Sequence, residues 1–110
     1  MKLLIVICDR TLSKKIIKIL NQESICYHVS FFGKGTADST ILSYFGLEKS
    51  EKEVILSLSE KENVELALKK MSTYDFIINH GAVAFAVPLD GISKNTLDYI
   101  KKMEVSDAKH

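Results

Sequence analysis

Several residue types are scarce in this chain of 110 residues, and each scarcity excludes a class of protein. The two cysteines, Cys8 and Cys26, are too few for a disulfide framework and lack metal-ligand spacing, so we expect reduced thiols that pack as small hydrophobic groups. Tryptophan is absent, so the core is expected to be mainly aliphatic. Arg10 is the only arginine and the net charge is +1, so no basic patch indicates nucleic acid as a partner.

Long hydrophobic runs are also missing. The apolar run at residues 2–8 stops at Asp9, which is too short to span a membrane, and no small-residue cleavage site follows it. We therefore expect a cytoplasmic protein with no direct membrane insertion. A length of 110 residues with 46% hydrophobic residues suits one domain, residues 1–110, with a flexible tail from about residue 104 to 110.

The hydrophobic pattern predicts four strands and three main helices. The strands are expected at residues 3–8, 25–32, 53–58 and 82–89, where apolar residues alternate or run together. The helices are expected at residues 11–22, 64–71 and 93–103, with a further short helix at residues 40–45 that ends at Gly46. Residues 48–52 are interpreted as a solvated linker.

Local signals refine these elements. Ser59 and Glu62 have the spacing of a capping box at the start of the second main helix, and Ser93 is placed to cap the last one. Pro88 cannot donate a hydrogen bond to a neighbouring strand, so the last strand is expected to lie at a sheet edge or to end there. That strand places alternate alanines, within residues 82–86, on one face and bulkier residues on the other.

The predicted order is that of an α+β ferredoxin-like βαββαβ sandwich, with an extra short helix after the second strand and a C-terminal helix. In this fold the helices cover one face of the sheet. The first strand is apolar on both sides and the last strand carries a bare alanine face. We therefore expect the open face of the sheet to be buried by self-association.

The most distinctive motif is the turn Gly33-Lys34-Gly35-Thr36, which follows a hydrophobic strand and precedes a helix start. The glycines permit positive φ and close approach to a ligand, while Lys34 and Thr36 add a cation and a hydroxyl suited to phosphate. The spacing is not that of a P-loop. Taken alone, it leaves an anion-binding loop and a simple strand-ending turn equally open.

Four segments, taken in chain order, form a specific set. They are the strand at residues 2–10, the Gly33-Lys34-Gly35-Thr36 turn, the route into the third strand at residues 45–56, and residues 81–90 with the sequence GAVAFAVPLD. Together they resemble the PII family of signalling proteins, in particular its short members with a reduced T-loop. The resemblance covers most of the chain. It implies a homotrimer whose sheets face inward.

The resemblance also implies a ligand cleft between neighbouring subunits, where family members commonly bind adenine nucleotides. Two loops would form its walls: Gly33, Lys34, Gly35 and Thr36 on one side, and Asn79, His80 and Gly81 on the other. Lys34 and Arg10 are the nearby cations, although Arg10 also has a simpler interpretation as an ion-pair partner of Asp9. No cofactor is required, and the candidate effectors are ATP, ADP, AMP or a cyclic nucleotide.

The chain departs from the family pattern in two places. The loop at residues 74–81 has no lysine or arginine, although a triphosphate normally needs two or more charge-assisted contacts. This favours a less charged ligand, such as a nucleoside monophosphate or cyclic nucleotide, and leaves loss of binding open. Residues 35–53 hold a compact apolar segment in place of an extended T-loop, so no modification site is transferred to Tyr44.

The implied function is that of a sensor which relays effector state to a regulated transporter or enzyme, in nitrogen or carbon regulation or transport. We find no nucleophile paired with a base, so no catalytic residue and no enzyme activity are expected. His28, His80 and His110 lack metal-ligand spacing. The alternative is a trimeric ferredoxin-like protein that binds metal or acts as a scaffold, and a degenerate enzyme ranks last.

Overall fold

A computed structural model describes residues 1–34, 51–75 and 82–108 of the chain. Its elements, in chain order, are β1 (Lys2–Asp9), the 3-10 turn η1 (Arg10–Leu12), α1 (Ser13–Gln22), β2 (Tyr27–Lys34), β3 (Glu51–Ser59), α3 (Lys61–Met71), β4 (Ala82–Pro88) and α5 (Lys94–Ala108). The short helix predicted at residues 40–45, with its cap Gly46, lies outside the described residues.

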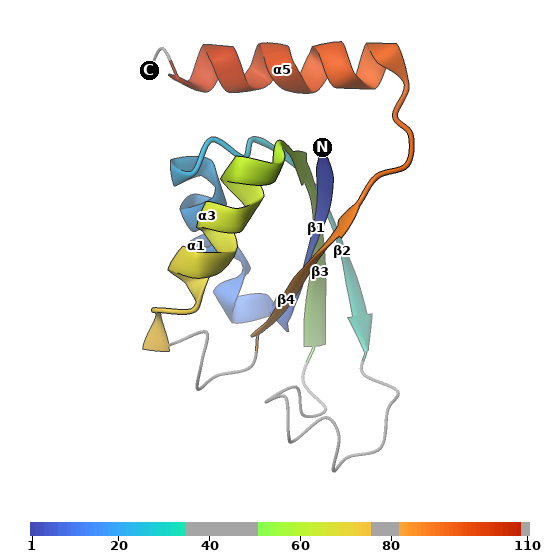
Figure 1. The fold of residues 1–110 in the computed structure, drawn as a ribbon. Coiled ribbons are helices and arrows are strands. Elements are labelled where there is room, and N and C mark those ends of the chain that lie inside the picture. Colours follow the sequence, from blue (N-terminus) through green and yellow to red (C-terminus); the bar gives the residue numbers. More distant parts are fainter. Residues whose placement is uncertain (35–50, 76–81, 109–110) are drawn as a thin grey trace.

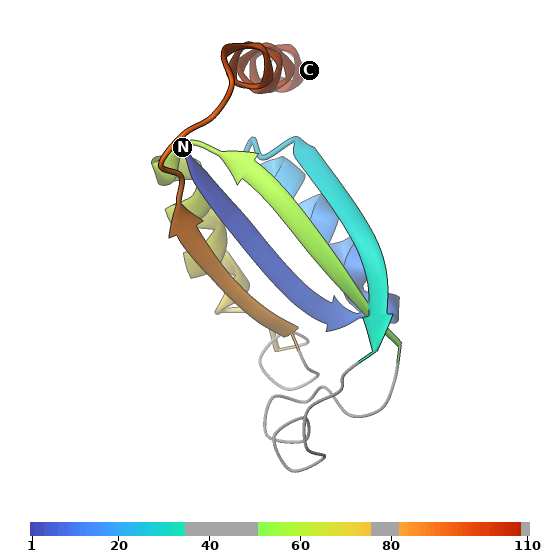
Figure 2. The same cartoon turned by 90° about the vertical axis from the view of Figure 1, so that its right-hand side faces the viewer.

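The four strands form one antiparallel sheet in the order β2-β3-β1-β4, and α1 and α3 cover one of its faces (Figure 1). This is the predicted α+β ferredoxin-like arrangement. β4 is an edge strand that ends at Pro88, so the prediction made from this proline is confirmed. Figure 2 shows the opposite face of the sheet, with no described helix in front of it.

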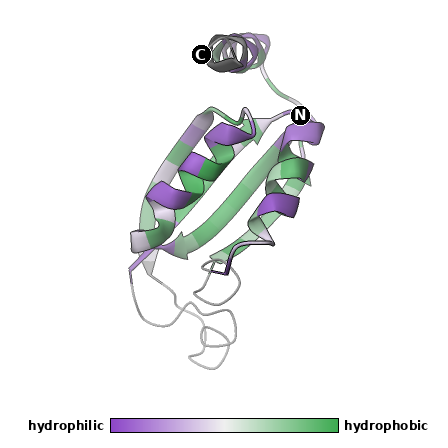
Figure 3. Ribbon diagram, turned by 90° about the vertical axis from the view of Figure 1, so that its left-hand side faces the viewer, coloured by the Kyte–Doolittle hydropathy of each residue, from purple (hydrophilic) through white to green (hydrophobic). Residues whose placement is uncertain are grey.

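The core lies between the sheet and the two covering helices, where Figure 3 shows hydrophobic strand surfaces behind α1 and α3. α1 contributes Ile16, Ile19 and Leu20, which recur at helical spacing and therefore share one face. The fully buried side chains of this cluster are Leu4, Val6, Cys8, Ile16, Leu20, Ile25, Ile55, Val64 and Ala67. The aliphatic core expected from the composition is confirmed.

The alanines of β4 face the helices rather than the open side of the sheet. Ala82, Ala84 and Ala86 pack against the core cluster, and α3 contacts this strand. The expectation that the alanine face lies on the open side of the sheet is therefore wrong, because the chain's own core already uses that face. The bulky residues of β4, including Phe85, lie on the open side.

A continuous apolar surface covers the open side of the sheet, and we name it the apolar sheet face. It consists of Tyr27, Val29 and Phe31 of β2, Val54, Leu56 and Leu58 of β3, Leu3, Ile5 and Ile7 of β1, and Val83, Phe85 and Val87 of β4. Phe31 is 50% exposed and Phe85 is 43% exposed. Large apolar side chains gathered on one exposed surface are typical of an interaction site.

β2 runs from Tyr27 to Lys34 rather than over residues 25–32. Ser24 adopts a left-handed φ of 61°, and Ile25 after it is fully buried in the helix-side core. A strand over residues 25–32 would place Ile25 on the same face as Tyr27. The alternation does not extend back to Ile25 because the chain changes direction between α1 and β2.

The start of α3 also differs from the prediction. Ser59 belongs to β3, and Glu60 precedes the helix without a side-chain cap. The Ser59 hydroxyl instead donates to Glu104 Oε1 at 2.5 Å and accepts from Asn63 Nδ2 at 3.2 Å. The predicted capping box is therefore wrong. β3 begins at Glu51, so the linker predicted at residues 48–52 already includes strand at its end.

α5 lies across one end of the sheet and extends further than predicted, to Ala108 (Figure 1). As predicted, Ser93 caps it, because its hydroxyl accepts a hydrogen bond from a first-turn backbone N–H at 3.2 Å. Ile100 is fully buried, and the ring of Tyr99 meets that of Tyr27 edge-on with centroids 6.4 Å apart. Neither α5 nor any other described helix is long and apolar enough to cross a membrane.

Candidate functional site

A small pocket lies at the end of the sheet where β1 leads into η1, β2 ends and β3 begins. Four described residues line it, Arg10, Phe32, Gly33 and Glu51, and its volume is about 210 Å³. The register brings these elements together, because Lys52 of β3 lies opposite Gly33 on one side and opposite Asp9 on the other. The pocket therefore depends on strand pairing between distant parts of the sequence.

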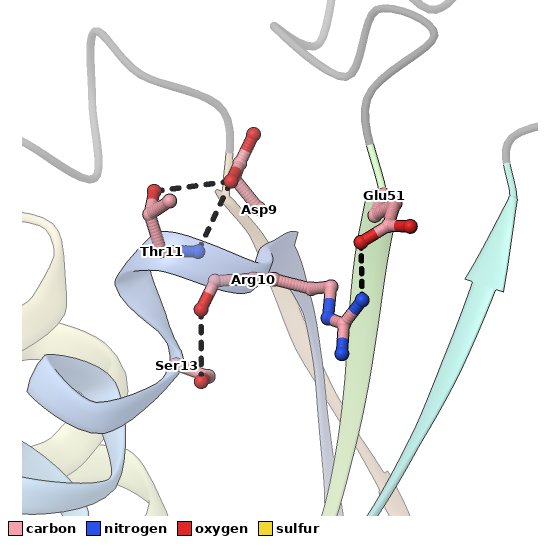
Figure 4. Close-up of polar contacts among 5 residues, drawn as sticks. All are labelled: Asp9, Arg10, Thr11, Ser13 and Glu51. Atoms are coloured by element: carbon pink, nitrogen blue, oxygen red, sulfur yellow. Dashed lines mark hydrogen bonds and ion pairs between the residues drawn. The ribbon is translucent and has the colours of Figure 1, made fainter.

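The guanidinium of Arg10 is held from two sides. Its Nη1 forms an ion pair with the Glu51 carboxylate across the gap between η1 and β3 (Figure 4). Its Cζ lies 3.7 Å from the centroid of the Phe32 ring, which is a cation–π contact. Within the described part of the chain, the other guanidinium N–H groups make no hydrogen bond, so they are available to an anion.

The backbone of η1 places Arg10 at the pocket. Asp9 caps this turn, because its Oδ1 accepts from Thr11 N at 3.1 Å and from Thr11 Oγ1 at 3.0 Å. Ser13 Oγ donates to the Arg10 carbonyl at 3.1 Å (Figure 4). Asp9 therefore caps η1, and the ion pair of Arg10 is with Glu51 rather than with Asp9, the partner in the simpler interpretation.

The ion pair is open to solvent, since the side chains of Arg10 and Glu51 are 40% and 67% exposed. Exposed pairs contribute roughly 0–1 kcal/mol, because water and salt screen them. An anionic ligand can therefore compete with Glu51 for the guanidinium at a small cost in stability. The stacked Phe32 ring, itself 62% exposed, adds a flat apolar surface beside this cation.

The structure brings together two of the site residues predicted from the sequence, Arg10 and Gly33. Gly33 lies in β2 without a positive φ, and a Cβ there would meet no atom within 4 Å, so nothing in the described part of the chain requires glycine. Lys34 is the last residue of β2, and its backbone lies opposite Glu51. The remaining predicted residues lie outside the described ranges: Gly35, Thr36, Asn79, His80 and Gly81.

Sequence reasoning missed two residues of this pocket. Phe32 was recognised only as a strand residue, and Glu51 was assigned to a solvated linker. The signal that identifies them is the antiparallel register, which sets Phe32 opposite Glu53 and the following residues of β2 opposite the start of β3. That register depends on pairing between β2 and β3, which sequence periodicity does not reveal.

His28 has a structural role. One ring nitrogen, Nδ1, lies 2.8 Å from Ser57 Oγ, and the other, Nε2, lies 2.8 Å from Asn21 Oδ1. Burial lowers the pKa of His28 below its usual range, so the neutral ring is favoured. Across residues 1–34, 51–75 and 82–108, no group of three or more His, Cys, Asp and Glu side chains is arranged to hold a metal ion.

Comparison with known proteins places the fold. No family model and no curated protein matches the sequence. A PII-like signalling protein from Thermus thermophilus aligns at 12% identity with a TM-score of 0.62, over 78% of this chain and 83% of its own. CPII from Thiomonas intermedia, solved with ADP, AMP and acetate, aligns at 15% identity with a TM-score of 0.63, over 77% of this chain and 81% of its own.

CutA1 from Pyrococcus horikoshii also shares the fold, at 12% identity and a TM-score of 0.66, over 94% of this chain and 97% of its own. At these identities the similarity shows the fold alone. The chain therefore shares the ferredoxin-like fold of these proteins.

Proposed function

We propose that this chain is a PII-like regulator: a non-catalytic homotrimer that binds a small effector between subunits and relays its state to a regulated protein. The observation that carries the proposal is the convergence of Arg10 and Gly33 in one pocket. Both residues were predicted from the sequence to belong to an anion-binding site. A guanidinium with unused donors beside an exposed aromatic ring is suited to a phosphate attached to a planar base.

The size of the pocket supports a site shared between subunits. Ligand pockets commonly measure roughly 300–1,000 Å³, so about 210 Å³ within one chain is small for a nucleotide. A neighbouring subunit would supply the missing wall. The apolar sheet face supports the homotrimer, because its exposed residues, such as Phe31 and Phe85, need a partner surface.

An adenine nucleotide is the proposed effector class, and the nucleotide-bound CPII structure supports this choice. Among the four described residues that line the pocket, Arg10 is the one cation. A monophosphate or cyclic nucleotide therefore fits this pocket better than a triphosphate, which usually engages two or more cationic or N–H donors.

Native mass spectrometry with AMP, ADP, ATP and cyclic AMP tests the proposal, because it measures oligomer and ligand together. We expect a trimer that retains a nucleotide, and we expect Arg10→Gln to lower occupancy at least roughly fivefold through loss of a charged hydrogen bond. Lys14→Gln is the matched control, since it removes the same charge from an exposed site on α1. A monomer, or a trimer that retains none of these nucleotides, would contradict the proposal.

A second candidate is a trimeric ferredoxin-like protein that binds a divalent cation or acts as a scaffold. It is favoured by the CutA1 alignment, which covers 94% of this chain against 78% for the Thermus PII-like protein. Thermal unfolding with Cu²⁺ or Zn²⁺, compared with the nucleotides, separates the candidates. A metal-dependent rise of several degrees with no nucleotide effect would favour the second.

A further inference from the structure

The described lining of the pocket beside Arg10 carries no formal net charge. Of its four lining residues, Arg10 is the cation and Glu51 is the anion, and their side chains form an ion pair. An anion that approaches the guanidinium therefore also approaches a carboxylate. Sites that bind polyphosphates gather several positive or N–H donors without such an opposing charge.

The geometry makes Glu51 a competitor for the ligand. A guanidinium donates its hydrogen bonds in its own plane, and the Phe32 ring already lies over one face of that plane. Glu51 occupies Nη1, so a bound anion must share the remaining donors or displace the carboxylate. The position of Glu51 is set by the sheet, because its backbone is paired with Lys34 at the start of β3.

We propose that Glu51 is a specificity-determining residue that limits the negative charge of the ligand at this pocket. The inference rests on the proposed nucleotide site and concerns its selectivity. The site binds a nucleoside monophosphate, and each further phosphate lowers the affinity. Charges near a protein surface interact more strongly than in bulk water, and salt screens them over a Debye length of about 8 Å. The discrimination is therefore expected to be roughly twofold to fivefold for each added charge.

Isothermal titration of AMP, ADP and ATP into the full-length protein and Glu51→Gln tests this assignment. The glutamine keeps the size and hydrogen-bonding capacity of the side chain and removes its charge. We expect the gain in affinity of Glu51→Gln over wild type to rise from AMP to ADP to ATP, by roughly twofold to fivefold at each step. A uniform gain, or none, would overturn the role of Glu51.

Glu65→Gln is the matched control, because it removes the same charge from an exposed residue of α3 that does not line the pocket. It should change the three affinities by less than about twofold and without a trend, since distant exposed charges are screened. A trend equal to that of Glu51→Gln would show a net-charge effect and overturn the assignment. If none of the nucleotides binds either protein, the proposed function fails with it, whereas binding without a trend rejects only the role of Glu51.

Discussion

The hydroxyl of Ser59 on β3 donates a 2.5 Å hydrogen bond to Oε1 of Glu104 on α5, joining residues 45 positions apart. This hydrogen bond connects α5, the terminal helix, to the end of the sheet. Burial raises the pKa of Glu104, and the hydrogen bond from Ser59, which favours the ionised carboxylate, offsets this only in part.

Glu104→Gln should remove a pH-dependent contribution to stability. Because the pKa of Glu104 is raised in the folded protein, its contribution is fully present below the unfolded pKa and is lost as pH rises through the folded pKa. The melting temperature of Glu104→Gln relative to wild type should therefore increase as the pH rises above the ordinary range of a glutamate carboxyl. Glu65→Gln serves as the control, and a difference for Glu104→Gln that does not vary with pH would contradict the prediction.

Ile5→Asp should disrupt self-association without unfolding the monomer. Ile5 lies at the centre of the apolar sheet face, opposite Leu56 on one side and Phe85 on the other, and away from the helix-side core. A carboxylate there would be buried without a partner in any assembly that uses this face. Light scattering should report loss of the proposed trimer, while circular dichroism retains the folded signal.

Leu66→Asp provides the comparison for that experiment. Leu66 is 54% exposed on α3, which covers the other side of the sheet, so the same charge at this position should leave the oligomer intact. If Ile5→Asp remained a trimer, the apolar sheet face would not be the subunit interface.

Arg10→Gln should lower the affinity for nucleotide more than it lowers the stability of the fold. Its ion pair with Glu51 and its stacking on Phe32 are exposed contacts, so their loss should lower the free energy of unfolding by about 1 kcal/mol or less. The loss of nucleotide affinity should be larger than this, because the guanidinium is the pocket's cation. Urea unfolding measured with nucleotide titration checks both effects, and a destabilisation of several kcal/mol would instead assign Arg10 a structural role.

The fold could be predicted because its signals are local. The apolar stripe of α1 and the missing N–H of Pro88 each act within a few residues, and the elements they indicate are present. The predictions failed where a contact with a residue far away in the sequence determines the local structure. Ser59 bonds Glu104 rather than capping α3, and the alanines of β4 face α3 because the sheet places them there.

The residues of the candidate site also fall into two groups, those identified from the sequence and those identified only from the structure. Arg10 was recognisable as the only arginine, whereas Phe32 and Glu51 became pocket residues only through the pairing of β2 with β3. No periodicity reveals such a register, because it depends on which strands meet and in what alignment.

Cys8 should be unreactive in the folded protein. It is fully buried, and burial raises the pKa of its thiol from 9.0 to about 11, with a further contribution from the nearby Glu53 charge. The thiolate is the reactive form, so in a Cys26→Ser variant a disulfide reagent at about pH 8 should label Cys8 only as the chain unfolds. Immediate labelling of the folded variant would contradict this burial.

The raised pKa of the Cys8 thiol also predicts a loss of stability at alkaline pH. The unfolded chain releases the Cys8 proton at a lower pH than the folded protein does, so the contribution of the thiol to stability is complete below pH 9.0 and is lost as pH rises toward about 11. Cys8→Ala should reduce this alkaline slope, at a cost of about 1 kcal/mol for the lost packing. Urea unfolding at a series of pH values should show the two curves converging as pH rises, whereas parallel curves would mean that the thiol does not titrate with folding.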